Sequence, residues 1–322
     1  MYLALFLLVV GFAVLIQGAN FLVNGASSVA KKFNISNVAI GLTLVAFGTS
    51  TPELIVSLYA ALEGRNDVSF ANIIGSNNFN LLFILGVSGL IFPLIVQRNT
   101  VKYEIPLSLL AALVLYILVN DQIVGNSPIN ILSRWDALIL LVFFGLFTMY
   151  IYRTMTTASD YEESPIKIYT TPLATGMIIL GVAMLTGGGT LVVDNAVVLA
   201  EHYGLSQKLI GLTILAAGTS LPELATCVVA AYRKNTDIAI GNIIGSNIFN
   251  IFFILGITGL VNPMSYNVVM NFDLEVLGES TIFLIIFMFT INQRKLDRWE
   301  AFLLLAGYIA YIIFLVVNDI GV

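Results

Sequence analysis

Apolar residues form long, uninterrupted runs over most of the chain, and short polar segments separate these runs. A transmembrane helix needs about 20 mostly apolar residues, whereas a membrane-spanning strand needs roughly 10 residues of alternating polarity. Several runs are much longer than a barrel strand and none alternates cleanly, so the pattern predicts an all-α polytopic membrane protein. Ten transmembrane helices are expected, near residues 2–24, 36–62, 68–92, 103–120, 135–153, 169–200, 206–231, 237–261, 273–291 and 299–317.

Composition supports the membrane assignment. Of the 322 residues, 58% are hydrophobic and 10% are charged, against roughly 25% charged residues in ordinary soluble domains. This balance excludes a cytosolic enzyme, a nucleic-acid-binding protein and a disordered chain. The single cysteine, Cys227, and the single histidine, His202, exclude a disulfide framework and multi-histidine metal catalysis, and we expect no functional role for either residue.

The positions of the basic residues predict the orientation in the membrane. If the N-terminus lies outside, 11 of the 14 lysines and arginines fall at inner loops or helix ends. Only Arg65, Arg134 and Lys208 then fall in outer loops, in agreement with the positive-inside rule. We therefore expect a multi-pass protein of the cell (plasma or inner) membrane, with both termini extracellular and the lipid bilayer as its environment.

The chain contains an internal repeat at an offset of 170 residues. When residues 40–86 are aligned with 210–256, 26 of 47 positions are identical, and the matches include Gly, Thr, Ser, Pro, Glu and Asn. Each half would hold five helices, an odd number, so the second copy must enter the membrane inverted. We predict a first repeat over 1–153, a cytoplasmic linker over 154–168 and a second repeat over 169–322, all in one membrane domain. Inverted repeats place a substrate site near the bilayer midplane.

Each repeat contains a proline that interrupts a helix. In the segments GTSTPE and GTSLPE, Pro52 and Pro222 lack an N–H group and crowd the carbonyl four residues earlier. The carbonyls freed around 46–49 and 216–219 must face a polar cavity or bind a ligand, because hydrocarbon cannot satisfy them.

Two glutamates follow these breaks. Glu53 and Glu223 lie deep in apolar segments at equivalent depths, and no Lys or Arg occurs at matching depth. A charged residue at the bilayer centre costs several kcal/mol by insertion scales, so a bound cation or a proton must neutralise each carboxylate. Paired glutamates of this kind could also be structural, protonated and hydrogen-bonded.

The second motif, GSNNFN or GSNIFN, adds serine and asparagine oxygens to the site. Ser76 and Asn80 are four residues apart and share a helix face, as do Ser246 and Asn250. Such residues could instead join helices through hydrogen bonds. Carboxylate, carbonyl, hydroxyl and amide oxygens suit Ca²⁺ and Na⁺ rather than Zn²⁺ or Cu⁺. Two carboxylates balance the charge of one Ca²⁺ or two Na⁺, which predicts competition between the two ions.

At these residues the chain resembles the cation/calcium exchanger superfamily, and within it the sodium/calcium exchangers of prokaryotic type. The two motif pairs are similar to that family's two alpha repeats, and the resemblance covers the full ten-helix plan. It implies a secondary antiporter that exchanges Ca²⁺ for Na⁺ by alternating access, with the first and sixth helices moving across a site held by the second, third, seventh and eighth. The ion ligands that it implies are Ala46, Thr49, Ser50, Glu53, Ser76, Asn80, Ala216, Thr219, Ser220, Glu223, Ser246 and Asn250.

The chain departs from the family's pattern at one position. Structurally studied relatives have Asp where this chain has Asn250, and potassium-dependent relatives also use an acid there, so potassium coupling is disfavoured. Cation/proton exchangers usually have GNAxE at the second motif, which differs from GSN here. The linker 154–168 is also too short for the regulatory insertion of animal exchangers.

Alternative functions are a Ca²⁺/H⁺ or other cation/proton antiporter and a passive cation channel. An intramembrane hydrolase that uses the two glutamates as an acid–base pair is disfavoured, because no nucleophile with its own base accompanies them. We therefore expect a transporter rather than an enzyme, with Ca²⁺ and Na⁺ as substrates, no cofactor and no obligatory protein partner. Asp194, which aligns with Asn24, is expected to cap a helix near a membrane face.

Overall fold

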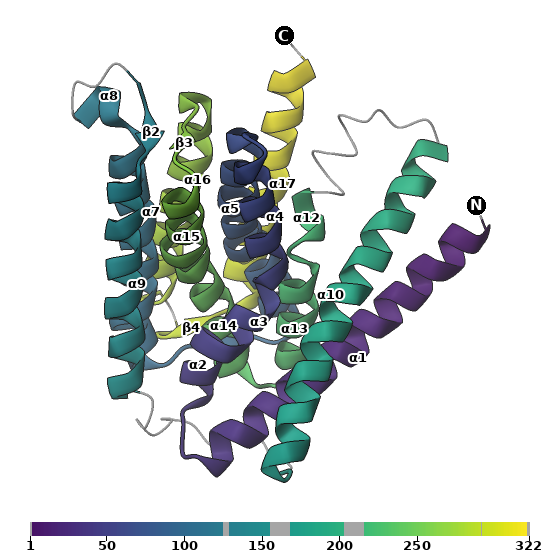
Figure 1. Cartoon of the computed structure of the whole chain (residues 1–322). Coiled ribbons are helices and arrows are strands. Elements are labelled where there is room, and N and C mark those ends of the chain that lie inside the picture. The colour runs from purple at the N-terminus through teal and green to yellow at the C-terminus, as the bar shows by residue number, and fades with distance from the viewer. Residues whose placement is uncertain (1, 125–128, 155–167, 203–215, 291, 321–322) are drawn as a thin grey trace.

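The computed structural model describes residues 2–124, 129–154, 168–202, 216–290 and 292–320, and within these ranges the chain is helical apart from four two-residue strands (Figure 1). The elements of the first half are α1 Tyr2–Lys32, α2 Asn37–Ile40, η1 Gly41–Val45, α3 Ala46–Thr49, α4 Thr51–Leu62, α5 Asn66–Asn78, η2 Phe79–Ile84, α6 Leu85–Ile91, β1 Leu94–Ile95, η3 Thr100–Glu104, α7 Ile105–Val119, α8 Asp121–Val124, β2 Ile131–Leu132 and α9 Arg134–Thr154. Those of the second half are α10 Thr171–His202, α12 Ala216–Gly218, α13 Leu221–Tyr232, α14 Thr236–Phe249, η5 Asn250–Leu255, α15 Gly256–Val261, β3 Met264–Ser265, η6 Val268–Met270, α16 Asn271–Phe287, β4 Lys295–Leu296 and α17 Arg298–Ile320.

Long apolar helices confirm an all-helical membrane protein. Within the described ranges, seven helices are long and apolar enough to cross a membrane, and a bent pair, Asn37–Thr49 with Thr51–Leu62, makes eight. The 17-residue α16 and the 12-residue α13 fall short of that length, and part of the expected seventh span lies outside the described residues. The count of ten spans therefore stays a prediction.

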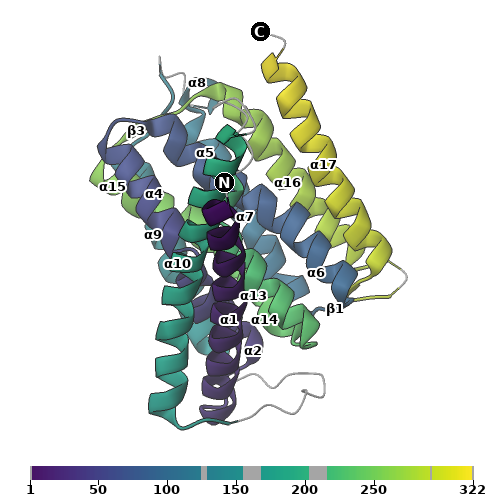
Figure 2. The same cartoon turned by 90° about the vertical axis from the view of Figure 1, so that its right-hand side faces the viewer.

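The helices α1 and α10 lie side by side along one flank of the molecule (Figures 1 and 2). Glycines form their contact: a Cβ atom on Gly18 would lie 2.9 Å from the backbone N of Leu185, and one on Gly188 would lie 2.9 Å from the backbone N of Leu15. Because Gly11 meets Gly188 whereas Gly25 meets Ala174, the two helices run antiparallel. Their backbones approach as closely as small residues allow.

The helices that carry the second motif form the centre of the molecule. Of the most apolar 18 residues of each span, 94% are buried in Thr236–Val261 and 78% in Asn66–Ile91. In the other long spans the buried share is at most 39%. The η1 backbone packs directly on α14, where a Cβ atom on Gly41 would lie 3.0 Å from the Cα atom of Gly241. Two central helices rich in Asn and Ser are thereby shielded from lipid by the other helices.

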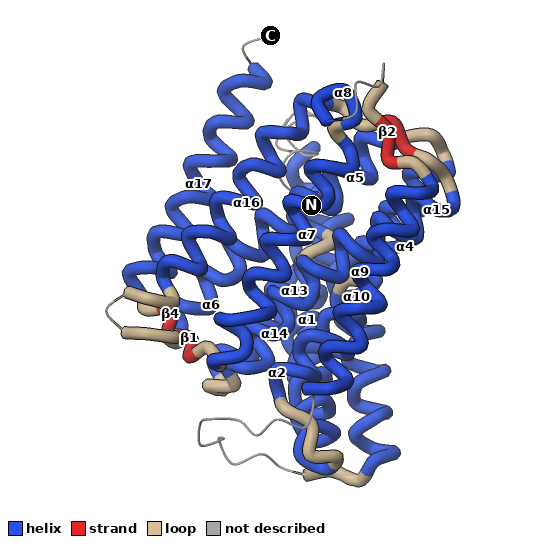
Figure 3. The backbone as a smooth tube through the Cα atoms, turned by 90° about the vertical axis from the view of Figure 1, so that its left-hand side faces the viewer, coloured by secondary structure: helices blue, strands red, loops and turns tan. Residues whose placement is uncertain are grey.

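The two halves of the chain interlock. Strand β1 pairs with β4 and β2 pairs with β3, so each short ribbon joins the halves; Figure 3 labels β1 and β4 of the first ribbon. Helix α9 packs on η5 and α15, whereas α17 packs on η2 and α6. The Nε atom of Arg134 donates to the Leu260 carbonyl at 3.1 Å, and that of Arg298 donates to the Leu90 carbonyl at 3.2 Å. The predicted division of the chain stays a prediction, since most of the linker lies outside the described residues.

The proline breaks occur where the sequence predicts them. Thr49 ends α3, Ser50 leaves helical geometry with ψ near 9°, and α4 continues with a bend of 48°. In the second half, Ser220 has ψ near 7° and α13 begins at Leu221. Each break places a serine at the junction of two helices and a glutamate in the first turn of the second helix.

Candidate cation-binding site

The two proline breaks face each other, and each serine contacts the glutamate of the other half. The Ser50 hydroxyl donates to Glu223 Oε1 at 2.8 Å, and the Ser220 hydroxyl donates to Glu53 Oε1 at 3.1 Å. All four residues are fully buried. The structure therefore brings together the residues of the two first motifs, which are 170 positions apart in the sequence.

The second motif completes this ring of oxygens. The Ser76 hydroxyl lies 3.3 Å from Glu53 Oε1 and 2.8 Å from the Ser220 hydroxyl. Its counterpart Ser246 lies 3.5 Å from Glu223 Oε1 and 3.0 Å from the Ser50 hydroxyl. Each glutamate thus has one oxygen held by two serines, one from each half.

Four oxygens of this cluster are buried and have no hydrogen-bond partner within the described part of the chain. They are Glu53 Oε2, Glu223 Oε2, Asn80 Oδ1 and Asn250 Oδ1, two from each half at equivalent positions. An unsatisfied buried carbonyl oxygen costs on the order of 1–3 kcal/mol, and an ionised carboxylate costs more. Neither glutamate forms an ion pair with a described basic residue, so the cluster has the donor chemistry of a cation site.

The asparagines of the GSN segments orient these oxygens. Asn80 Nδ2 donates to Asn247 Oδ1 at 3.0 Å, and Asn250 Nδ2 donates to Asn77 Oδ1 at 2.9 Å. Asn77 and Asn247 also donate to each other's backbone carbonyls, at 3.2 and 3.3 Å. Because the amide nitrogens are held, only the oxygens of Asn80 and Asn250 are left without a partner in the described part of the chain. The π-helical segments η2 and η5 include these two residues, and π-helical turns often occur at functional sites.

Two further asparagines hold the predicted threonines. The Thr49 hydroxyl donates to Asn242 Oδ1 at 3.1 Å, and the Thr219 hydroxyl donates to Asn72 Oδ1 at 3.2 Å. Asn72 Nδ2 in turn donates to Ser57 at 2.9 Å, and Asn242 Nδ2 lies 3.2 Å from Cys227 Sγ. Cys227 therefore contacts a residue that holds Thr49, a contact that its isolation in the sequence did not suggest. The available signal was its position, 170 residues after Ser57.

The remaining predicted ligands are backbone groups. The Ala46 carbonyl accepts hydrogen bonds from the Ser50 N–H at 2.9 Å and from the Thr49 hydroxyl at 3.3 Å. Ala216 begins α12, and its side chain lies outside the described part of the chain, as do residues 203–215 before it. The structure thus gathers the predicted serines and glutamates into one cluster. Asn80 and Asn250 lie four residues after Ser76 and Ser246 on the same two helices, and Asn72 and Asn242 hold the threonines.

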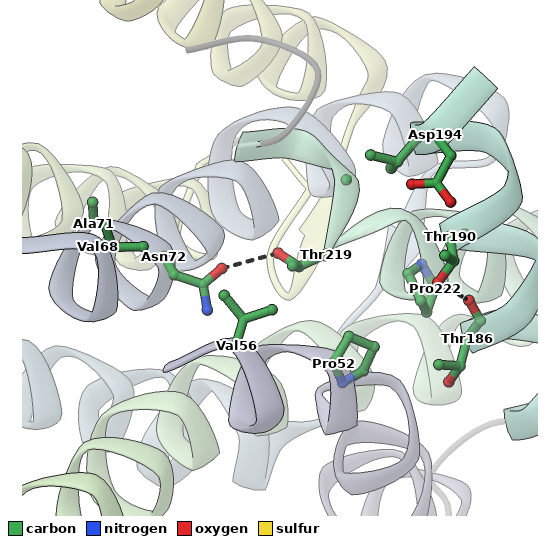
Figure 4. Close-up of a pocket in the computed structure, with 13 residues that line it drawn as sticks. Pro52, Val56, Val68, Ala71, Asn72, Thr186, Thr190, Asp194, Thr219 and Pro222 are labelled. Atoms are coloured by element: carbon green, nitrogen blue, oxygen red, sulfur yellow. Dashed lines mark hydrogen bonds between the residues drawn. The ribbon is translucent and has the colours of Figure 1, made fainter. Parts of the chain in front are cut away.

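A pocket of about 620 Å³ lies beside this cluster, between α10 and the proline breaks (Figure 4). Thr219 and Pro222 line it from one half, and Pro52 and Asn72 line it from the other. Asp194 also lines the pocket, eight residues before the end of α10, so the prediction that it caps a helix is wrong. The pocket is partly open to the outside and reaches Thr219, the neighbour of Ser220 in the cluster.

Interrupted membrane helices around a buried, oxygen-lined cluster define the class of ion-coupled secondary transporters. The family described as sodium/calcium exchanger protein matches residues 3–153 and 173–317 of this chain. The chain therefore belongs to the sodium/calcium exchanger family, which consists of transporters rather than enzymes.

Individual relatives agree with this assignment along nearly the whole chain. The putative antiporter CaxA of Alkalimonas amylolytica is 37% identical over 97% of this chain and 98% of its own length. The sodium/calcium exchanger MaX1 of Methanosarcina acetivorans is 30% identical over 96% of this chain and 97% of its own. A solved structure of the sodium-calcium exchanger NCX_Mj superposes with a TM-score of 0.81 at 33% identity and covers 98% of this chain and 99% of that one. The fold of this chain is therefore that of NCX_Mj.

Proposed function

We propose that this protein exchanges Ca²⁺ for Na⁺ across the cell membrane, at a single site shared by the two halves. The observation that carries the proposal is the set of four buried oxygens without partners, on Glu53, Asn80, Glu223 and Asn250. Their equivalent positions give one carboxylate and one amide oxygen to each half. The names of MaX1 and NCX_Mj support the choice of the two ions.

Charge balance explains why the two ions would compete. With both glutamates ionised, the site carries a charge of −2, which one Ca²⁺ or two Na⁺ neutralise. The full proposed ligand set adds the serine hydroxyls and, at the edge of the cluster, the threonines and the carbonyls of Ala46 and Ala216. Ca²⁺ takes six to eight oxygen ligands in flexible geometry, and this oxygen-rich set suits that demand. The transported ions are substrates, and no cofactor takes part in the proposed exchange.

Access would alternate through the flank formed by α1 and α10. The proposed arrangement is ten helices in two inverted repeats, with both termini outside the cell, and the distribution of basic residues supports it. The pocket next to Thr219 is lined by Thr190 and Asp194 near the end of α10, and under the proposed topology that end of α10 is extracellular. The glycine contacts between α1 and α10 would let these helices move as a pair and close this pocket.

Cation/proton exchange is the second candidate, since the same carboxylates bind protons in the absence of metal. The Asn residues at 80 and 250 favour Na⁺, because they leave only two acids in the cluster to carry protons. A passive channel is less well supported, because the four oxygens are buried in a closed cluster rather than along an open pore.

Transport into proteoliposomes tests the proposal. Vesicles loaded with Na⁺ and diluted into Na⁺-free buffer with labelled Ca²⁺ should accumulate Ca²⁺, whereas vesicles loaded with choline should not. Uptake driven equally by an acid interior would establish proton exchange instead, and uptake that follows voltage alone would establish a channel. Glu279→Gln, the same substitution at an exposed site on α16, is the matched control and should transport like the wild type.

A further inference from the structure

A second buried carboxylate lies outside the transport site. Glu104, at the end of η3, is only 3% exposed, and its Oε1 atom accepts a hydrogen bond from the Tyr150 hydroxyl at 2.5 Å. The Glu104 Oε2 atom and the Thr100 hydroxyl, one turn earlier, are both buried, and besides a weak contact between the Thr100 hydroxyl and the Glu104 carboxyl group neither has a hydrogen-bond partner among the described residues. A carboxylate and a hydroxyl whose hydrogen bonding is incomplete therefore occur together in a segment that the exchange mechanism does not use.

These groups line a small cavity of about 10 Å³. The volume matches the roughly 10–15 Å³ that one water molecule requires, so a single small ion or water molecule fits. Besides Glu104 and Thr100, the polar residues of its wall are Ser36, Gln97, Asn99 and Thr154. It lies at the end of the molecule where α2 begins and α9 ends, the lower end in Figure 1.

The charges around Glu104 do not neutralise it. Lys102, on the same element, is exposed and lies over the ring of Tyr103, 5.0 Å from its centroid. On α14, Asp237 accepts a hydrogen bond from Gln97 at 2.7 Å. The segment of α2 and η1 contributes only Ser36 and apolar residues to the wall, and no described basic residue forms an ion pair with Glu104.

We propose that Glu104 and Thr100 form the core of a second cation site, which binds one Na⁺ ion and is separate from the transport site. One carboxylate balances one monovalent ion, whereas Ca²⁺ would leave an excess positive charge in a buried position. Hydroxyl and carboxylate oxygens are the ligands that such a hard cation prefers. The hydroxyls of Ser36 and Thr154 complete the oxygen set, since each retains acceptor capacity.

An ion in this cavity would act on the transport site through one continuous segment. The wall includes Ser36, Val38, Ala39 and Leu42, which belong to the start of the helix that breaks at Ser50. A bound Na⁺ would fasten this segment to η3 and α9. Under the proposed topology the cavity lies on the cytoplasmic side, so the occupancy of this site would follow the cytoplasmic Na⁺ concentration.

The test uses the full chain with the transport site inactivated by Glu53→Gln and Glu223→Gln. In this background Na⁺, compared with choline at equal ionic strength, should raise the melting temperature by about 2–3 °C at tenfold over half-saturation. The larger K⁺ ion should give a smaller shift. Adding Glu104→Gln should remove the Na⁺ response, because the amide keeps the shape and the contact with Tyr150 but not the charge.

Asp273→Asn in the same background is the matched control. Asp273 also accepts a hydrogen bond from a tyrosine, Tyr311, at 2.6 Å, but it has no buried oxygen without a partner. This variant should keep the Na⁺ response. If adding Glu104→Gln prevents folding, Thr100→Val replaces it and should raise the half-saturating Na⁺ concentration at least threefold. No Na⁺ response in the background, or a response unchanged by these substitutions, would overturn the second site without affecting the proposed exchange.

Discussion

Replacing Glu223 with Gln should weaken Ca²⁺ binding far more than Na⁺ binding. The substitution keeps the shape of the side chain and the Oε1 acceptor for Ser50 and Ser246, so the fold should be retained. It changes the charge of the site from −2 to −1. One Na⁺ still neutralises the remaining carboxylate of Glu53, whereas a bound Ca²⁺ leaves one uncompensated positive charge in a fully buried cluster.

The size of the effect follows from that uncompensated charge. Insertion scales assign about 2.5–3.5 kcal/mol to a single charge at the centre of a membrane helix. At about 1.4 kcal/mol per tenfold change, the dissociation constant for Ca²⁺ should rise roughly 100-fold. The first Na⁺ should bind with little change, because its complex with one carboxylate is neutral.

Isothermal titration calorimetry on purified protein, with Ca²⁺ and Na⁺ titrated separately, measures both constants. Counterflow of labelled Ca²⁺ in proteoliposomes gives the functional counterpart and should be nearly abolished. Glu279→Gln, at an exposed site, controls for the loss of one acid from the molecule as a whole. A Ca²⁺ affinity within threefold of wild type, or an equal loss of Na⁺ affinity, would refute the assignment of Glu223 to a charge-balanced site.

Three further substitutions probe other parts of the site. Asn250→Asp adds a third titratable group to the cluster, so the pH profile of Ca²⁺ transport should shift, and an unchanged profile would show that Asn250 does not line the site. Asn77→Ala removes the acceptor that holds Asn250 and should lower the free energy of unfolding by about 1–3 kcal/mol, measured by chemical denaturation in detergent. Gly18→Val inserts bulk where a Cβ atom would already lie 2.9 Å from the Leu185 backbone, so transport should slow while Ca²⁺ affinity persists. Gly145→Ala, with no atom within 4 Å of the added Cβ, should behave as wild type in the same assay, and equal rates for both glycine variants would contradict a moving contact.

The repeated motif allowed much of the site to be predicted from the sequence. An offset of 170 residues identifies which positions are equivalent, and a carboxylate inside an apolar helix needs a cation or a proton, so Glu53 and Glu223 could be paired from the sequence alone. The different roles of the asparagines in the GSN segments were harder to predict. Asn247 and Asn77 hold the nitrogens of Asn80 and Asn250 and leave their oxygens without a partner, and this arrangement depends on cross-half hydrogen bonds that no local pattern encodes.

Other features could not be predicted for similar physical reasons. Asp194 was expected to cap a helix near a membrane face, yet α10 continues for eight more residues. The burial of Glu104 depends on α2 and α9, which lie far away along the chain. Sequence periodicity describes one helix at a time and does not show which neighbours cover it.

The interlocking of the halves has a consequence for biogenesis. Helix α9 of the first half packs on η5 and α15 of the second half, and α17 of the second half packs on η2 and α6 of the first. Each half therefore needs the other to cover its helices. The helices of the first half would therefore lack these partners during synthesis until the last helix has been made. Assembly of the ion-binding centre is therefore a late event that follows completion of the polypeptide, and truncation just before α17 would leave η2, with Asn80, open to lipid.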